Sequence, residues 1–242
     1  TMQLNGGNQM VNQLLGQINN NNQKKQNSII PVLDFSKEQL WVKFIDTFYE
    51  MFGQKFISNV ETIHNIKVLF FYFLRDAEFF KCKNLRGDIS KPSFQKGLLI
   101  IGGYGLGKTD YFKAFEKVFE KIDNYRFKFY NSKELVAKYE LCQTSFDKSF
   151  FYKDIERKKI FIDDLNSERV ANNYGKMDLI EEVLSIRYNK KRKTFASCNY
   201  SNTNECAVKT LENLGIRYGA RIYDRFYEMF NIIEFKGKSF RR

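Results

Sequence analysis

Residues 97–119 place an apolar stretch, a glycine-rich loop and an amphipathic stretch in direct succession. Residues 97–101 are apolar and have the length of a buried strand. The loop reads Gly-Gly-Tyr-Gly-Leu-Gly-Lys-Thr from Gly102 to Thr109, and residues 110–119 carry apolar side chains at helical spacing. A strand that enters a helix through a loop of the form G-x-x-x-x-G-K-S/T is the arrangement of the phosphate-binding loop. The sequence therefore predicts an α/β fold built around this unit.

Each fixed position of this loop has a physical task. The glycines let backbone N–H groups turn toward a phosphate chain, and the helix N-terminus adds a favourable dipole. Lys108 is expected to reach the β- and γ-phosphates, and the Thr109 hydroxyl to hold Mg²⁺. The alternative is a tight strand-to-helix turn with a coincidental lysine and threonine. The expected cofactors are ATP and Mg²⁺, and the predicted nucleotide-contacting residues are Gly102, Gly103, Tyr104, Gly105, Leu106, Gly107, Lys108, Thr109 and Asp110.

Two later strands end in polar residues that suit the same site. Residues 159–162 are an apolar strand followed by Asp163 and Asp164. An acid at the carboxyl end of a strand beside the loop can hold Mg²⁺, and a second acid can orient the attacking water. We assign Asp163 to the metal, together with Thr109, and Asp164 to the water. Asn199 ends the next strand and could bind the γ-phosphate or that water. Aspartate and asparagine are also common in caps and turns, which is the alternative interpretation.

Most of the chain alternates strands with helices, which predicts a parallel sheet covered on both faces. Residues 81–96 are polar and are interpreted as a linker. Further strands are predicted over residues 125–130, 159–164, 194–199 and 232–235, and helices over 36–52, 60–80, 132–156 with a break near 144, 176–188, 204–214 and 220–230.

The beginning of the chain has a different composition. Residues 1–28 are dominated by Asn, Gln and Gly, which predicts a flexible tail. An apolar face at helical spacing interrupts it, formed by Met10, Val11, Leu14, Leu15 and Ile18. That face could be a partner-binding helix or a helix docked on its own domain. The predicted organisation is a tail over 1–28, a helical segment and linker over 29–94, and an ATP-binding core over 95–242.

Composition limits the class of protein. The chain has 242 residues and a net charge of +12, which favours a polyanionic partner such as DNA, although a lysine-rich composition bias would add the same charge. Candidate basic contacts are Lys133, Lys138, Lys148 and residues 190–193, and the last run also fits a solvated turn. The four cysteines show no C-x-x-C spacing, and no apolar run approaches the roughly 18 residues of a membrane span. We therefore expect free thiols and a cytoplasmic protein without membrane contact. His64 is the one histidine and lies in an apolar helix, which excludes histidine-based catalysis.

In order along the chain, the stretches GGYGLGKT, IDDL, SCNYS, YGARIYDRF and KGKSFR resemble the DnaC/IstB group of AAA+ ATPases over about residues 95–242. The resemblance implies a P-loop NTPase (AAA+) fold with an N-terminal helical extension and no sizeable C-terminal lid. It also implies a sensor role for Asn199, an arginine finger at Arg225, and a terminal arginine at Arg241. By spacing alone, Arg225 could instead pair with Glu228 on the helix surface. Gly103 replaces the usual proline, and the first 90 residues match no family pattern.

Three functions are compatible with these features. The first is an ATPase that loads a replicative helicase onto single-stranded DNA, docking through the N-terminal region. The second is an IstB-like ATPase that assists a transposase in selecting target DNA. The third is a small-molecule P-loop kinase. For the first two, the resemblance implies ATP hydrolysis stimulated by DNA in a homo-oligomer, with Asp164, Asn199 and Arg225 as the catalytic residues.

Overall fold

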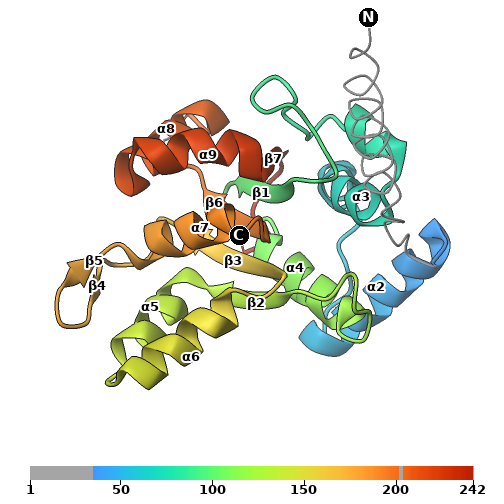
Figure 1. Ribbon diagram of the computed structural model, residues 1–242. Coiled ribbons are helices and arrows are strands. Elements are labelled where there is room, and N and C mark those ends of the chain that lie inside the picture. The colour runs from blue at the N-terminus through green and yellow to red at the C-terminus, as the bar shows by residue number, and fades with distance from the viewer. Residues whose placement is uncertain (1–34, 202–203, 242) are drawn as a thin grey trace, which may run out of the picture. The chain divides into compact units, whose positions relative to one another are not determined.

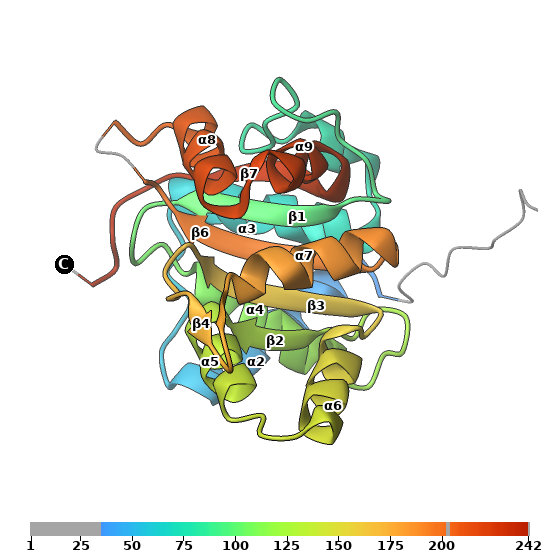
Figure 2. The ribbon, with the colours of Figure 1, turned by 60° about the vertical axis from the view of Figure 1, so that its left-hand side comes forward.

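Five parallel strands form the centre of the fold, and they lie in the order β2-β3-β6-β1-β7 (Figure 2). The computed structural model describes residues 35–201 and 204–241, so the predicted tail and the amphipathic stretch from Met10 to Ile18 lie outside the described residues. The parallel sheet expected from the sequence is confirmed. Its strands are β1 (Gly97–Gly102), β2 (Lys128–Asn131), β3 (Lys159–Leu165), β6 (Lys193–Asn199) and β7 (Phe230–Phe235).

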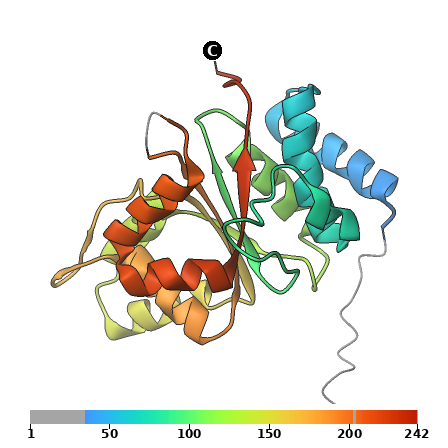
Figure 3. The ribbon, with the colours of Figure 1, turned by 90° about the horizontal axis from the view of Figure 1, so that it is seen from above.

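Helices cover both faces of this sheet, as the view from above shows (Figure 3). Side chains alternate between the faces of a strand, so successive residues of β1 enter different cores. Leu99 and Ile101 belong to the core of the first face, and Leu98 and Ile100 to that of the second. The first face carries α5 (Ser132–Glu140), α6 (Ser145–Ile155), α7 (Leu179–Asn189), α8 (Ala207–Tyr218) and α9 (Ala220–Met229).

The second face carries α2 (Lys37–Phe52), α3 (Val60–Leu74) and α4 (Lys108–Phe119), which lie together on the right in Figure 1. Its core is mainly aromatic. The Phe44 ring of α2 lies 4.8 Å from the Phe115 ring of α4 and 5.4 Å from Phe70 of α3. The helices before β1 thus share one core with the helix that follows the glycine loop. The packing is continuous across residue 95, and the predicted domain boundary there stays a prediction.

Most predicted helices form where local signals place them. Ser36 and Gln39 make the expected capping box of α2, and Gly53 ends this helix with φ of 64°. The helix expected over 60–80 is shorter, because Arg75 adopts a left-handed conformation after Leu74 and a separate 3₁₀ helix, η1 (Ala77–Lys81), follows.

Two predicted boundaries are wrong for local reasons. The strand expected over 125–130 begins only at Lys128, because the backbone N–H groups of Tyr125 and Arg126 donate to the Ile122 carbonyl in a turn. The helix expected from residue 176 begins at Leu179, where Asp178 caps it. The residues before it form an unpredicted antiparallel pair, β4 (Ala171–Asn172) with β5 (Lys176–Met177).

The segment 81–96, interpreted as a linker, runs along the edge strand β7. The Arg86 N–H donates to the Ile232 carbonyl at 2.8 Å, and the Glu234 N–H donates to the Asn84 carbonyl at 2.8 Å. Leu85 forms an isolated antiparallel bridge with Ile233. An edge strand exposes unpaired backbone groups, and this segment satisfies two of them. The linker is therefore a packed part of the fold.

The remaining structural expectations concern cysteines and membrane contact. Cys82, Cys142 and Cys198 are free thiols, as predicted. Over residues 35–201 and 204–241, no helix is long and apolar enough to span a bilayer.

We predict that Phe44→Ala lowers the free energy of unfolding of the whole described fold by about 3–5 kcal/mol, because a fully buried ring is removed from the core shared by α2, α3 and α4. Urea unfolding followed by Trp41 fluorescence, which reports on α2, and by far-UV circular dichroism measures this loss. The two signals should shift together. Val42→Ala, at a position 57% exposed, is the matched control and should change little. A Trp41 transition that separates from the circular dichroism transition would contradict a shared core.

Candidate functional site

The predicted polar residues meet at the carboxyl ends of β1, β3 and β6. These strands are neighbours in the parallel sheet, so their ends lie at one edge, and Gly102 pairs in register with Asn199. A cavity of about 540 Å³ opens there. It is lined by Gln54, Tyr104, Gly105, Leu106, Gly107, Lys108, Thr109, Asp110, Asp163, Asp164, Ser197, Asn199, Phe240 and Arg241.

The glycine loop has the backbone conformation that requires glycine. Gly105 and Gly107 have φ of 73° and 79°, in the left-handed region that other residues avoid. A Cβ atom on Gly107 would lie 2.7 Å from the Tyr111 ring, which supports the loop from below. The loop leads directly into the first turn of α4, so the helix N-terminus faces the cavity. This geometry suits a phosphate chain.

Lys108 connects the loop to β6. Its ammonium donates hydrogen bonds to the carbonyls of Gly102 at 2.8 Å and Gly103 at 2.6 Å, and to Asn199 Oδ1 at 2.9 Å. Only 7% of the residue is exposed. Burial lowers the pKa of Lys108 to about 8, and the nearby Asp163 and Asp164 oppose that shift. A buried ammonium that contacts only neutral oxygens is well placed to bind an anion.

Asp163 lies at the centre of a second group of contacts. The Thr109 hydroxyl donates to Asp163 Oδ2 at 2.8 Å, and the Ser197 hydroxyl donates to Asp163 Oδ1 at 2.6 Å. Burial raises the pKa of the Asp163 carboxyl, and these two hydrogen bonds counteract the rise. A hydroxyl and a carboxylate side by side are oxygen ligands of the kind Mg²⁺ prefers.

The two oxygen ligands alone would not make a metal cage. Among the described residues, no group of three His, Cys, Asp or Glu side chains could hold a metal ion. Magnesium usually keeps several waters and takes one or two protein ligands plus phosphate oxygens. Thr109 and Asp163 therefore fit Mg²⁺ that arrives with a nucleotide.

A bulge at the end of β3 directs Asp164 into the same cavity. Consecutive strand residues normally point to opposite faces. Here the pairing with β6 shifts between Ile162 and Leu165, and Asp164 adopts φ of 60°. Asn199 Nδ2 then donates to Asp164 Oδ1 at 2.6 Å. The bulge thus brings both acids to one cavity, as bulges beside active sites often do.

Not every predicted residue lines the cavity. Gly102 and Gly103 contribute carbonyls to Lys108 instead. Arg225 lies on α9, where its guanidinium donates to Ser185 Oγ at 2.7 Å and stacks over the Tyr188 ring at 4.5 Å. The helical spacing also allowed an ion pair between Arg225 and Glu228. In the structure Glu228 instead accepts a hydrogen bond from the Tyr188 hydroxyl.

Sequence reasoning missed three residues of this cavity and left the role of a fourth open. Gln54 had no motif signal, and Ser197 and Phe240 stood in the stretches SCNYS and KGKSFR without a role. Their placement depends on how β6, the turn after α2 and the residues after β7 pack. Arg241 had the signal of a terminal arginine. It reaches the cavity because the Phe240 N–H donates to the Gly105 carbonyl at 3.0 Å, which holds the end of the described chain against the loop.

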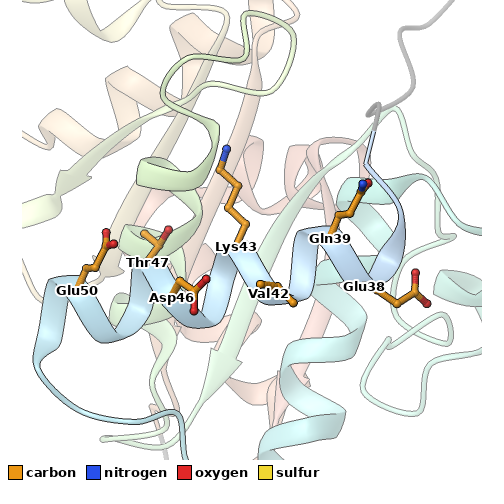
Figure 4. A pocket seen from close by; sticks show the side chains of 7 residues that line it. All are labelled: Glu38, Gln39, Val42, Lys43, Asp46, Thr47 and Glu50. Carbon is orange, nitrogen blue, oxygen red and sulfur yellow. The ribbon is translucent and has the colours of Figure 1, made fainter.

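A second hollow lies on the outer face of α2 (Figure 4). Its lining comes from this one helix and includes the carboxylates Glu38, Asp46 and Glu50 beside Lys43. None of the predicted catalytic, metal-binding or nucleotide-contacting residues takes part in it. It is the face of a single helix, and the cavity at the glycine loop is the candidate site.

Comparison with known proteins adds a fold-level likeness. No protein-family model matches the chain, and no curated protein matches it. The crystal structure of the DnaC helicase loader is 22% identical, covers 80% of this chain and 99% of its own, and has a TM-score of 0.52. A DnaI crystal structure is 20% identical over 78% of this chain and 89% of its own, with a TM-score of 0.49. AMPPCP-bound DnaA from Aquifex aeolicus is 15% identical over 75% and 48%, with a TM-score of 0.47.

The first of these likenesses identifies the fold. The described residues share the fold of that DnaC structure, which confirms the α/β P-loop architecture expected from the motifs.

We predict that Ser197→Ala destabilises the fold in a pH-dependent way in magnesium-free buffer. Burial raises the pKa of Asp163 in the folded state. Ionisation of this carboxyl therefore lowers the free energy of unfolding as pH rises through that pKa. Below the unfolded pKa of about 3.9 the carboxyl is protonated in both states, and this loss of stability vanishes. Removing the hydroxyl raises this pKa further. The expected loss is about 1.5–3 kcal/mol at pH 8 and much less at pH 4. Urea unfolding at both pH values measures it.

The control is the same substitution in an Asp163→Asn background, where the pH dependence of the loss should disappear. An equal loss at pH 4 and pH 8 in the single variant would mean that Ser197 stabilises the fold without acting on the Asp163 carboxylate.

Proposed function

We propose that the chain is an ATP-binding and ATP-hydrolysing AAA+ protein that acts on DNA as a loader of a replicative helicase. The observation that carries this proposal is the chain of contacts Lys108–Asn199–Asp164, beside the Thr109–Asp163 pair, at one end of the glycine loop. It combines a phosphate-binding cation, a pair of oxygen ligands and a second carboxylate in one cavity.

The proposed chemistry follows from these positions. The loop N–H groups and Lys108 bind the phosphates of ATP, and Thr109 and Asp163 hold Mg²⁺, which when bound neutralises charge on the β- and γ-phosphates. Asp164 orients the attacking water through the carboxylate oxygen that Asn199 does not occupy. Asn199 touches both Lys108 and Asp164, so it is suited to couple phosphate binding to the position of the water.

The proposal assigns Arg225 to the site of a neighbouring subunit. Arg225 lies on α9 and is not among the residues that line the cavity of its own chain. A finger supplied in trans stabilises transition-state charge only when subunits assemble. The stacking of Arg225 on Tyr188 holds its guanidinium in place at the surface.

DNA contact is proposed at the surface formed by α6 and the β4–β5 hairpin. Three aromatic side chains are largely exposed there: Phe146 at 77%, Phe150 at 68% and Tyr174 at 90%. Lys148 lies over the rings of Tyr139 and Tyr174 at 5.5 Å each. Exposed rings beside a cation suit the stacking and charge pairing by which proteins bind single-stranded nucleic acid.

A loader is preferred over a transposase helper because the fold likeness is to a helicase loader. We propose that the region before residue 95 docks the helicase, that the active form is a homo-oligomer with ATP, and that it works in the cytoplasm.

The shared site can be tested by mixing two inactive variants. Asp164→Asn and Arg225→Ala should each bind ATP and lose turnover by roughly 10²-fold or more. In a mixed head-to-tail assembly, about a quarter of the sites combine an intact Asp164 with an intact Arg225. An equimolar mixture should therefore recover about a quarter of wild-type ATPase activity. Lys108→Ala, which should lose ATP binding, is the control. No recovery, with each variant still assembling, would place Arg225 outside the site.

The biological role is tested by stimulation and capture. ATP turnover should rise with single-stranded DNA, and the full chain should capture a hexameric replicative helicase while ignoring a transposase. Capture of the transposase alone would favour the IstB-like alternative. Turnover that ignores DNA and depends on a small phosphoryl acceptor would overturn the proposal in favour of a kinase.

A further inference from the structure

A basic groove lies at the amino edge of the sheet, where β2 and β3 begin, while the nucleotide cavity lies at their carboxyl ends. The groove has a volume of about 850 Å³. We call it the basic groove because seven basic side chains line it against three acidic ones. The basic residues are Lys113, Lys117, Arg126, Lys128, Arg157, Lys158 and Lys159, and the acids are Glu116, Glu120 and Asp123.

The acids of this groove are already paired. Each is in an ion pair with a basic side chain of the groove, and Arg157 pairs with Asp154 at 2.6 Å. The groove pairs are Lys117–Glu120 at 2.8 Å, Arg126–Asp123 at 3.2 Å and Lys128–Glu116 at 3.9 Å. Such exposed pairs contribute little to stability and can exchange partners. Among the described residues, Lys113, Lys158 and Lys159 have no ion-pair partner, so the groove carries unneutralised positive charge.

Lys159 is the most constrained of these cations. It lies beside Lys193, its register partner on β6, so both side chains leave the same face of the sheet. Each ammonium donates to a backbone carbonyl, Lys159 to Asn124 and Lys193 to Phe94 at 2.7 Å. Burial lowers the pKa of each lysine to about 8, and the neighbouring charges that act on them are all positive.

At the amino edge of the sheet, backbone carbonyls accept the hydrogen bonds of the buried basic side chains. These carbonyls are neutral and do not compensate the positive charge. Helix ends and strand beginnings present carbonyl oxygens here, and Arg187, which is fully buried, is held by the carbonyls of Ile155, Arg157 and Lys193. A helix C-terminus supplies only about half a negative charge. The cations at this edge are therefore available to a further anion.

We propose that the basic groove binds the sugar–phosphate backbone of a nucleic acid without reading its bases. The groove presents cations, and its aromatic side chain, Phe127, is buried, so backbone contact is expected where stacking is not. A backbone with regularly spaced phosphates matches several cations along one groove better than a single small anion does. The net charge of +12 agrees with such a partner. This site is separate from the α6 surface and needs no ATP.

Lysine footprinting tests the proposal on the full chain without nucleotide. The protein is acetylated with and without a 30-nucleotide single strand of mixed sequence, and modified lysines are measured by mass spectrometry. Lys128 and Lys158 should be protected by DNA, and Lys209, exposed on α8, should not. Protection confined to Lys133, Lys138 and Lys148 would overturn the groove while leaving the proposed function intact. Protection of the groove by polyglutamate and not by DNA would also overturn it, in favour of an acidic polypeptide.

A variant pair provides a second measurement. Lys158→Ala should weaken DNA binding about fivefold at 0.1 M salt and reduce the salt slope of log Kobs by about 0.7, the value for one lost phosphate contact on a single strand. Lys209→Ala is the control of equal charge change and should have neither effect. Equal effects of the two substitutions would indicate a general charge attraction and would overturn the site. Lys108→Ala should abolish ATPase activity and leave DNA binding at the basic groove unchanged. This result would separate the inference from the proposed function.

Discussion

The hydrogen bond from Lys108 to Asn199 joins two parts of the site that are 91 residues apart, and the geometry of the site depends on it. It forms because β1 and β6 are parallel neighbours with Gly102 opposite Asn199, so the loop and the polar end of β6 leave the sheet together. The same amide then donates to Asp164. A single asparagine thus uses its acceptor on a cation and its donor on a carboxylate, and a carboxylate in its place would repel Asp164.

The glycine loop packs against the aromatic core that α2 and α3 form with α4. Tyr111 lies under Gly107 and contacts Phe48 and Phe56, whose ring centroids are 6.1 and 5.7 Å away. These contacts connect the segment before β1 to the backbone that would wrap a phosphate chain. Gln54, in the turn after α2, reaches the cavity for the same reason. A displacement of α2 would therefore reach the glycine loop through packed side chains.

Local features were predictable from the sequence, and among the long-range ones the meeting of three strand ends at the glycine loop was predictable as well. The glycine loop needs glycine where φ is positive, and the capping box of α2 needs Ser36 and Gln39, so both could be identified from a few adjacent residues. The position of Ser197 beside Asp163 depends on strand order and register, which no short pattern encodes. The β4–β5 pair is too short to give a periodic signal. The role that we propose for Arg225 lies in the site of a second subunit, which no short pattern in one chain describes.

The two edges of the sheet differ in charge, and the difference follows from the parallel fold. At the carboxyl edge, the N-terminus of α4 favours anions, and the proposed Mg²⁺ would offset the charges of Asp163 and Asp164 there. At the amino edge, carbonyl groups attract lysine and arginine, as Lys159, Lys193 and Arg187 show. Further basic side chains lie beside these carbonyl groups and line the basic groove. The two sites that we propose, one for a nucleotide at the carboxyl edge and one for a phosphate backbone at the amino edge, therefore use different side chains.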